Sequence, residues 1–203
     1  MTMETHFLLM RHARTQWNQQ RRIQGQTDTP LAPEGIKTAK GWGPCLAGRG
    51  IDLILTSDLQ RARHTAELVN EHLTLPVETD PRLREQHWGD WTGLYVADLR
   101  AMREEVRARE SKGFGFMPPG GEDRQQVFLR ASMALTDAAK KHAGKRILVT
   151  THNGVLRVLA YKLLGMQFTP EEPLPIKKDY RLHHLICNGG RLRAHELNLE
   201  FRT

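Results

Sequence analysis

An arginine and a histidine stand together where an apolar run ends near the start of the chain. The run is Phe7-Leu8-Leu9-Met10, and Arg11 and His12 follow it directly. An apolar run that breaks into polar residues predicts a short buried strand leading into a loop. Such loops are where parallel α/β sheets bind ligands, and an imidazole there can attack as a nucleophile. Because ordinary loops often contain such a pair, a functional reading needs partners elsewhere.

Two later strands are predicted to end in the same way. The apolar run at 51–55 is followed by Ser57, with Arg61 one turn into the next helix, and the run at 146–150 is followed by His152 at a helix start. Since parallel strands end at one edge of a sheet, two arginines, two imidazoles and the positive end of a helix dipole should converge. Such a group predicts an anion site, and a guanidinium fork fits the oxygens of a phosphoryl group.

His12 could act on a phosphoryl group as well as bind it. A neutral imidazole is a competent nucleophile, so His12 could form a phosphohistidine while the arginines neutralise charge on the transferred group. The leaving alkoxide would need a proton, which a partly buried carboxylic acid can supply. Glu85, in a polar loop beside Trp88, is the best candidate for this acid.

The elements that must position these groups alternate between strand and helix. Helices are expected from about 33 to 47, from about 58 to 72, from 122 to about 142 and after 152. A further short strand is expected at 76–79. This alternation predicts an α/β fold whose parallel sheet is covered on both faces. The segments 181–187 and 191–197 flank Asn188-Gly189-Gly190, which predicts a hairpin and an antiparallel edge.

Four side chains are interpreted as signals for helix starts. Ser57 and Gln60 have the spacing of a capping box. Asp58 and Glu122 could contact the site, but acids are favoured near helix N-termini, so we expect that role for both.

A rim or lid insertion is predicted at about 94–121. Residues 94–110 read as one exposed, charge-rich helix. The glycines and prolines of 113–121 argue against regular structure there.

The length and composition of the chain predict one domain of ordinary size. It has 203 residues, 39% of them hydrophobic, and we expect a single domain over 1–203. No apolar run is long enough to cross a bilayer, and the first residues lack a secretory signal pattern. We therefore expect a cytoplasmic protein that binds no membrane.

The formal net charge of +7 favours anionic partners, with nucleic acid the first to test. The lysines occur as isolated pairs at 140–141 and 177–178, and the arginines are scattered among acidic residues. We therefore expect a small phosphorylated substrate and no nucleic acid. Cys45 and Cys187 are far apart, which predicts neither a disulfide framework nor a zinc site.

Five blocks of the sequence resemble the histidine phosphatase superfamily, which includes the cofactor-dependent phosphoglycerate mutases. They run in family order from residue 7 to about residue 160. The blocks are Arg11-His12-Ala13-Arg14-Thr15-Gln16-Trp17-Asn18, Gln24-Gly25-Gln26-Thr27-Asp28-Thr29-Pro30-Leu31, Ser57-Asp58-Leu59-Gln60-Arg61-Ala62-Arg63-His64-Thr65-Ala66, Leu83-Arg84-Glu85 through Gly93, and Thr151-His152-Asn153-Gly154-Val155-Leu156-Arg157.

The resemblance implies a three-layer α/β/α sandwich and a set of roles. His12 would be the nucleophile, Glu85 the proton donor that later activates water, and Arg11, Arg61 and His152 the phosphoryl-binding groups. Further positions would line the substrate pocket: Asn18, Gln24, Gly25, Trp88 and Asn153. The scheme needs no metal or other cofactor, and relatives are commonly homodimers.

Two departures from the family pattern bear on activity. Ala13 stands where the family usually has glycine, so the loop must accept ordinary dihedrals there. Chains that resemble the mutases are longer and carry a lysine and an adjacent arginine pair in the segment that corresponds to 114–121. This chain has no such pair there. The stretch 118–122 instead resembles the phosphatase branch, which favours hydrolysis over mutase-type transfer.

Two alternatives from other classes stay open. His12, His152 and Glu85 could in principle hold a metal ion, although the neighbouring arginines would repel a cation. A non-catalytic phospholigand-binding protein could also keep such a pocket. The presence of all five expected catalytic residues weighs against that reading.

Overall fold

The computed structural model describes residues 3–201 and is built on one six-stranded sheet. The strands lie in the order β3-β2-β4-β1-β5-β6. β1, β2, β3 and β4 pair in parallel, whereas β5 runs antiparallel between β1 and β6. Their bounds are β1 Thr5–Arg11, β2 Leu53–Thr56, β3 Val77–Thr79, β4 Arg146–Thr151, β5 Leu182–Asn188 and β6 Arg191–Leu199. The predicted α/β class, with a parallel sheet and an antiparallel edge, is confirmed.

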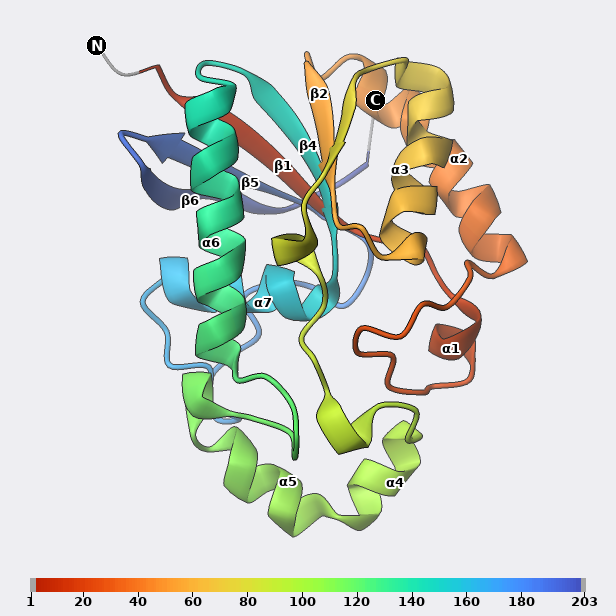
Figure 1. Cartoon of the computed structure of the whole chain (residues 1–203), viewed down its shortest axis with the longest axis vertical. Helices are drawn as coiled ribbons and strands as arrows, with labels where there is room; N and C mark the ends of the chain where they lie inside the picture. The colour runs from red at the N-terminus through yellow and green to blue at the C-terminus, as the bar shows by residue number, and fades with distance from the viewer. Residues whose placement is uncertain (1–2, 202–203) are drawn as a thin grey trace.

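Helices cover both faces of this sheet (Figure 1). The four long ones are α2 Pro33–Ala47, α3 Gln60–Leu73, α6 Arg124–Lys141 and α7 Asn153–Leu163. β1 shows how the layers form, because its side chains alternate between two cores. Phe7 and Leu9 pack with α6 and α7, whereas Leu8 and Met10 pack with α2 and α3. Among residues 3–201, no helix has both the length and the apolarity to span a bilayer.

The strand register brings three polar loops to one edge of the sheet. Arg11 at the end of β1 pairs with Thr151 at the end of β4, and Thr56 at the end of β2 pairs with Thr150. The chain therefore leaves these neighbouring strands at the same level. The residues that follow them, 12, 57 and 152, begin the loops that carry the candidate site.

The structure corrects the predicted helix starts. α3 begins at Gln60 with Leu59 as its N-cap and without a side-chain cap, so the predicted capping box is wrong. Asp58 forms an ion pair with Arg84 instead of capping a helix. Asp123, and not Glu122, caps α6. Glu122 instead forms an ion pair with Arg130.

The rim differs from the prediction in both of its parts. One helix was expected over 94–110, but there are two, α4 (Val96–Ala101) and α5 (Arg103–Glu110), which meet at Met102. The segment expected to be irregular contains a 3-10 turn, η3 (Gly113–Gly115). Figure 1 shows α4 and α5 at the bottom of the molecule, opposite the end at which β1 begins.

Candidate active site

His12 is a buried imidazole just after β1. Its side chain is 2% exposed, and Nδ1 lies 2.8 Å from the carbonyl oxygen of Ala13. A carbonyl only accepts, so Nδ1 donates and Nε2 keeps its lone pair. Burial, together with the nearby charges of Arg11 and Arg61, holds the pKa of His12 well below its ordinary value. The side chain is therefore a neutral imidazole with a free nucleophilic nitrogen.

Ala13 occupies an ordinary backbone conformation. It is absent from the non-glycine residues of positive φ in the described chain. Its N–H donates to the Thr65 hydroxyl, at 3.0 Å, and that hydroxyl donates to the Arg61 carbonyl. The loop therefore accommodates alanine where the family usually has glycine, and Thr65 ties it to α3.

Arg61 is held as a fixed fork. Its side chain is 1% exposed, and its two terminal nitrogens donate to the carbonyls of Thr27, at 2.8 Å, and Gly25, at 2.7 Å. Burial is the main reason that its pKa is lowered to about 10. Gly25 thus contributes a carbonyl that orients Arg61, from a backbone with φ of 51°.

His152 is the N-cap of α7 and lies against His12. The two ring centroids are 5.2 Å apart. Nε2 lies 2.9 Å from the Ser57 hydroxyl, which also accepts from the Leu59 N–H. When Ser57 donates to Nε2, the ring proton lies on Nδ1. Burial, followed by the charge of Arg61, holds the pKa of His152 well below its ordinary value.

Three buried nitrogens in this group have no hydrogen-bond partner within residues 3–201: Arg11 Nε, Arg61 Nε and His152 Nδ1. Each belongs to a residue that the sequence predicts to bind a phosphoryl group. A buried polar atom without a partner costs about 1–3 kcal/mol. A ligand with several oxygen acceptors would satisfy all three at once.

Glu85 meets the first turn of α7. Its Oε1 accepts from the N–H of Gln86, at 2.9 Å, and its Oε2 from the N–H of Gly154, at 3.1 Å. A β-carbon on Gly154 would lie 2.1 Å from Oε1. Only glycine at this position leaves room for the carboxylate.

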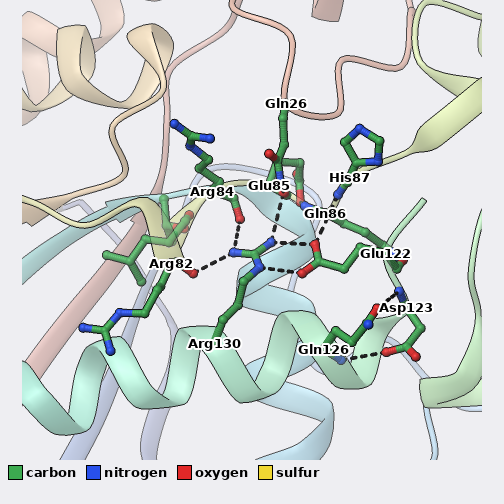
Figure 2. A network of polar contacts seen from close by, with 12 residues as sticks. Gln26, Arg82, Arg84, Glu85, Gln86, His87, Glu122, Asp123, Gln126 and Arg130 are labelled. Carbon is green, nitrogen blue, oxygen red and sulfur yellow. Dashed lines mark hydrogen bonds and ion pairs between the residues drawn. The ribbon is translucent and has the colours of Figure 1, made fainter. Parts of the chain in front are cut away.

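Arg130 holds the loop that carries Glu85 (Figure 2). Its guanidinium donates to the carbonyl oxygens of Arg82, Arg84 and Glu85, at 2.6, 2.6 and 3.0 Å. It also forms a two-point ion pair with Glu122, at 2.7 and 2.9 Å. Arg130 thus uses α6 to fix the backbone on either side of the candidate acid.

Apart from Gly25, the predicted pocket residues fall into two groups. Trp88 and Asn153 line a cavity with Glu85. Asn18 and Gln24 bond within their own loop instead, because Asn18 caps α1 (Gln16–Gln19) together with Thr15, and the Gln24 oxygen accepts from the Thr15 hydroxyl. Within residues 3–201, no three His, Cys, Asp or Glu side chains are grouped so that they could hold a metal ion.

Sequence reasoning missed Thr65 and Arg130. Thr65 lies inside a family-like block, but its spacing reveals no role. Arg130 lies on α6, 45 positions from Glu85, so no local pattern links the two. Only the packing of α6 against the 82–85 loop exposes its function.

Burial of neutral imidazoles predicts acid lability. In the unfolded chain His12 and His152 titrate near 6.5, whereas folding lowers both pKa values. As pH falls below 6.5, the unfolded state therefore binds protons at these imidazoles and the folded state does not. Each such imidazole should lower the unfolding free energy by about 1.4 kcal/mol per pH unit.

Urea unfolding at about pH 7.5 and about pH 5 tests this pH dependence of stability. Both pH values lie above the ordinary pKa values of carboxylates, so the imidazoles dominate the difference. His183, also buried with a pKa lowered to about 4, adds to the slope in the same direction. A His152→Asn variant should show a shallower slope than the wild type. Equal stability at the two pH values would contradict the assignment of neutral buried rings.

Comparison with known proteins shows similarity along nearly the whole chain. The sequence model of the histidine phosphatase superfamily (branch 1) matches residues 7–200. Two curated proteins named "Probable phosphoglycerate mutase GpmB" are similar over 189 residues. The Klebsiella pneumoniae protein is 36% identical, covering 89% of this chain and 87% of its own, and the Yersinia pestis protein is 34% identical, covering 93% and 84%.

Two solved structures with the same fold are phosphatases by title. The mycobacterial glucosyl-3-phosphoglycerate phosphatase complexed with VO3 has a TM-score of 0.82 and 29% identity, covering 96% of this chain and 99% of its own. The alpha-ribazole phosphatase from Shigella flexneri has a TM-score of 0.77 and 29% identity, covering 97% of both chains.

Proposed function

This chain belongs to the histidine phosphatase superfamily, branch 1, and we propose that it is a phosphomonoester hydrolase working through a phosphohistidine at His12. One observation carries the proposal. The neutral ring of His12 lies beside three buried nitrogens, on Arg11, Arg61 and His152, that have no hydrogen-bond partner within residues 3–201. The substrate is a small phosphorylated metabolite, and the reaction needs no metal.

In the first step, Nε2 of His12 attacks phosphorus and the bond between phosphorus and the ester oxygen breaks. Arg11, Arg61 and His152 bind the non-bridging oxygens and stabilise their charge in the transition state. The Glu85 carboxyl gives its proton to the leaving oxygen, which departs as an alcohol. The products of this step are phosphohistidine and a Glu85 carboxylate.

In the second step, water replaces the alcohol. Glu85 takes a proton from the water as its oxygen attacks phosphorus, and the nitrogen–phosphorus bond breaks. Inorganic phosphate leaves, His12 is again neutral and Glu85 is again protonated. The hydrogen bond from Nδ1 to the Ala13 carbonyl keeps Nε2 aimed at phosphorus throughout.

The names of the relatives favour a second candidate, phosphoryl transfer to a phosphoglycerate. The first step is the same, and only the acceptor of the phosphoryl group differs. We favour water, because the segment 114–121 contains no lysine or arginine to hold an anionic acceptor.

Labelling with a 32P-phosphoester tests the mechanism. Wild-type protein quenched in alkaline denaturant should carry an acid-labile label, because phosphohistidine withstands base and not acid. His12→Ala should carry none, whereas His195→Ala, which removes an exposed histidine, should label normally. Turnover without a His12-dependent label would refute the mechanism.

Two further arms separate the alternatives. Labelling and turnover should survive exhaustive chelation, and a loss restored by added metal would establish metal catalysis instead. Label chased with excess 3-phosphoglycerate should appear as inorganic phosphate. Its appearance in a bisphosphate would identify a mutase, and wild-type protein that binds phosphate without turnover would identify a binding protein.

A further inference from the structure

The backbone of Ala13 sets the orientation of the proposed nucleophile. Its carbonyl oxygen accepts from Nδ1 of His12, at 2.8 Å. The N–H and the carbonyl of Ala13 belong to the two rigid peptide planes on either side of one α-carbon, with only two soft dihedrals between them. A group that fixes the plane of the N–H therefore limits how far the carbonyl, and with it the His12 ring, can turn.

Thr65, on α3, holds that N–H. Its hydroxyl oxygen lies 3.0 Å from the Ala13 nitrogen and 2.7 Å from the carbonyl oxygen of Arg61, one turn earlier on the helix. A hydroxyl has one hydrogen, and a carbonyl can only accept, so the hydroxyl donates to Arg61 and accepts from Ala13. Both Thr65 and Ala13 are fully buried, so water does not compete for either bond.

These two bonds join groups that meet at phosphorus. In the proposed first step, His12 attacks phosphorus while Arg61 binds the oxygens around it. The Arg61 fork is itself fixed, because its terminal nitrogens donate to the carbonyls of Gly25 and Thr27. The Thr65 hydroxyl therefore connects the loop of the attacking ring to the helix that carries a phosphoryl-binding group.

We propose that Thr65 is a positioning residue for the phosphorylation of His12, which keeps Nε2 in line with a phosphoryl group held by Arg61. This inference rests on the proposed function. Thr65 acts through the Ala13 peptide and not on the reacting atoms. Its loss should therefore slow the transfer step and leave phosphate binding intact, since all three phosphoryl-binding groups stay in place.

Single-turnover labelling with a 32P-phosphoester measures the transfer step. Thr65→Val keeps the shape of the side chain and removes the hydroxyl. Label should appear roughly 10- to 100-fold more slowly, because a misplacement of about 1 Å can cost about 10²-fold in rate. The Kd of inorganic phosphate, measured by calorimetry, should stay at its wild-type value. Thr65→Ser keeps the hydroxyl and should label almost as fast as the wild type.

Thr5→Val is the matched control for lost stability. Thr5 is also a buried threonine, and its hydroxyl accepts from the N–H of Gly144, at 3.2 Å, and lies 3.4 Å from the carbonyl oxygen of Ala139. It begins β1, whereas His12 follows the other end of that strand. Both valine variants leave a buried N–H without its partner, so both should be less stable. Only Thr65→Val should label slowly.

Four results would overturn the positioning role. They are wild-type labelling by Thr65→Val, equal slowing in Thr5→Val, no recovery in Thr65→Ser, and phosphate binding weakened as much as labelling. If Thr65→Val does not fold, Thr65→Cys takes its place, because a thiol is a weaker acceptor and should also slow labelling.

The same labelling separates this role from the mechanism on which it rests. Wild-type protein that turns over substrate without a label would refute the phosphohistidine mechanism, and the positioning role with it. A labelled wild type beside an equally fast Thr65→Val would refute the positioning role alone.

Discussion

A Gly154→Ala variant should lose most of its turnover on alkyl phosphate esters and keep its fold. The added β-carbon would lie 2.1 Å from Glu85 Oε1, and the next two atoms that it meets belong to the same carboxylate. Because these atoms end a flexible side chain, the carboxylate rotates away and the backbone stays in place. Alanine also favours a helix over glycine by about 1 kcal/mol, which offsets residual strain.

The size of the expected loss follows from the acid role proposed for Glu85. General acid catalysis contributes roughly 10²- to 10⁴-fold, so kcat on an alkyl ester should fall within that range. Glu85→Gln should fall by a similar factor. Both variants should slow an activated aryl ester much less, because its leaving group needs little protonation.

Gly41→Ala is the matched control. It is the same substitution inside a helix, α2, where a β-carbon meets nothing within 4 Å. Its activity should equal that of the wild type and its melting temperature should not fall. If Gly154→Ala kept full alkyl-ester activity, or slowed both classes of ester equally, Glu85 would lose the acid role.

Arg61→Lys should reduce kcat/KM by roughly 10²- to 10³-fold, the loss typical of a preorganised donor to a developing charge. The guanidinium satisfies two carbonyls and still presents Nε to the site. A single ammonium cannot hold that geometry. The carbonyls of Gly25 and Thr27 then lose partners, which should destabilise the fold by about 1–3 kcal/mol.

Steady-state kinetics and urea unfolding measure the two effects separately. Arg63→Lys, an exposed position on the same helix, provides the same chemical change away from the site and should alter neither quantity. Wild-type kcat/KM in Arg61→Lys would show that charge alone suffices. The fork geometry would then have no part in phosphoryl binding.

The residues that follow the strands could be predicted because the sheet decides where they lie. Apolar runs revealed β1, β2 and β4, and parallel strands end together, so Arg11, His12 and His152 had to be near one another. Arg61 followed because it lies one turn into α3. Their chemical roles stay predictions that the labelling experiment tests.

The surroundings of the acid could not be predicted, because they depend on contacts between distant segments. Asp58 and Glu122 have the spacing of helix-start residues, yet tertiary packing gives them the arginines 84 and 130. Likewise, the Ser57 hydroxyl bonds to the His152 ring and accepts from the N–H of Leu59, so it does not act as the cap of α3. An ion pair or a buried ring nitrogen outcompetes a local cap here, and sequence spacing shows only the local option.

Among residues 3–201, the buried nitrogens without partners around His12 prepare the site for a ligand but lower the stability of the folded chain. They reduce a net stability that is only about 5–15 kcal/mol in a typical domain, at the positions that substitution could most easily improve. A bound phosphoryl compound satisfies them and shifts the folding equilibrium by mass action. Under the proposed function, depletion of the substrate would leave the protein in the less stable of its two forms and shorten its lifetime.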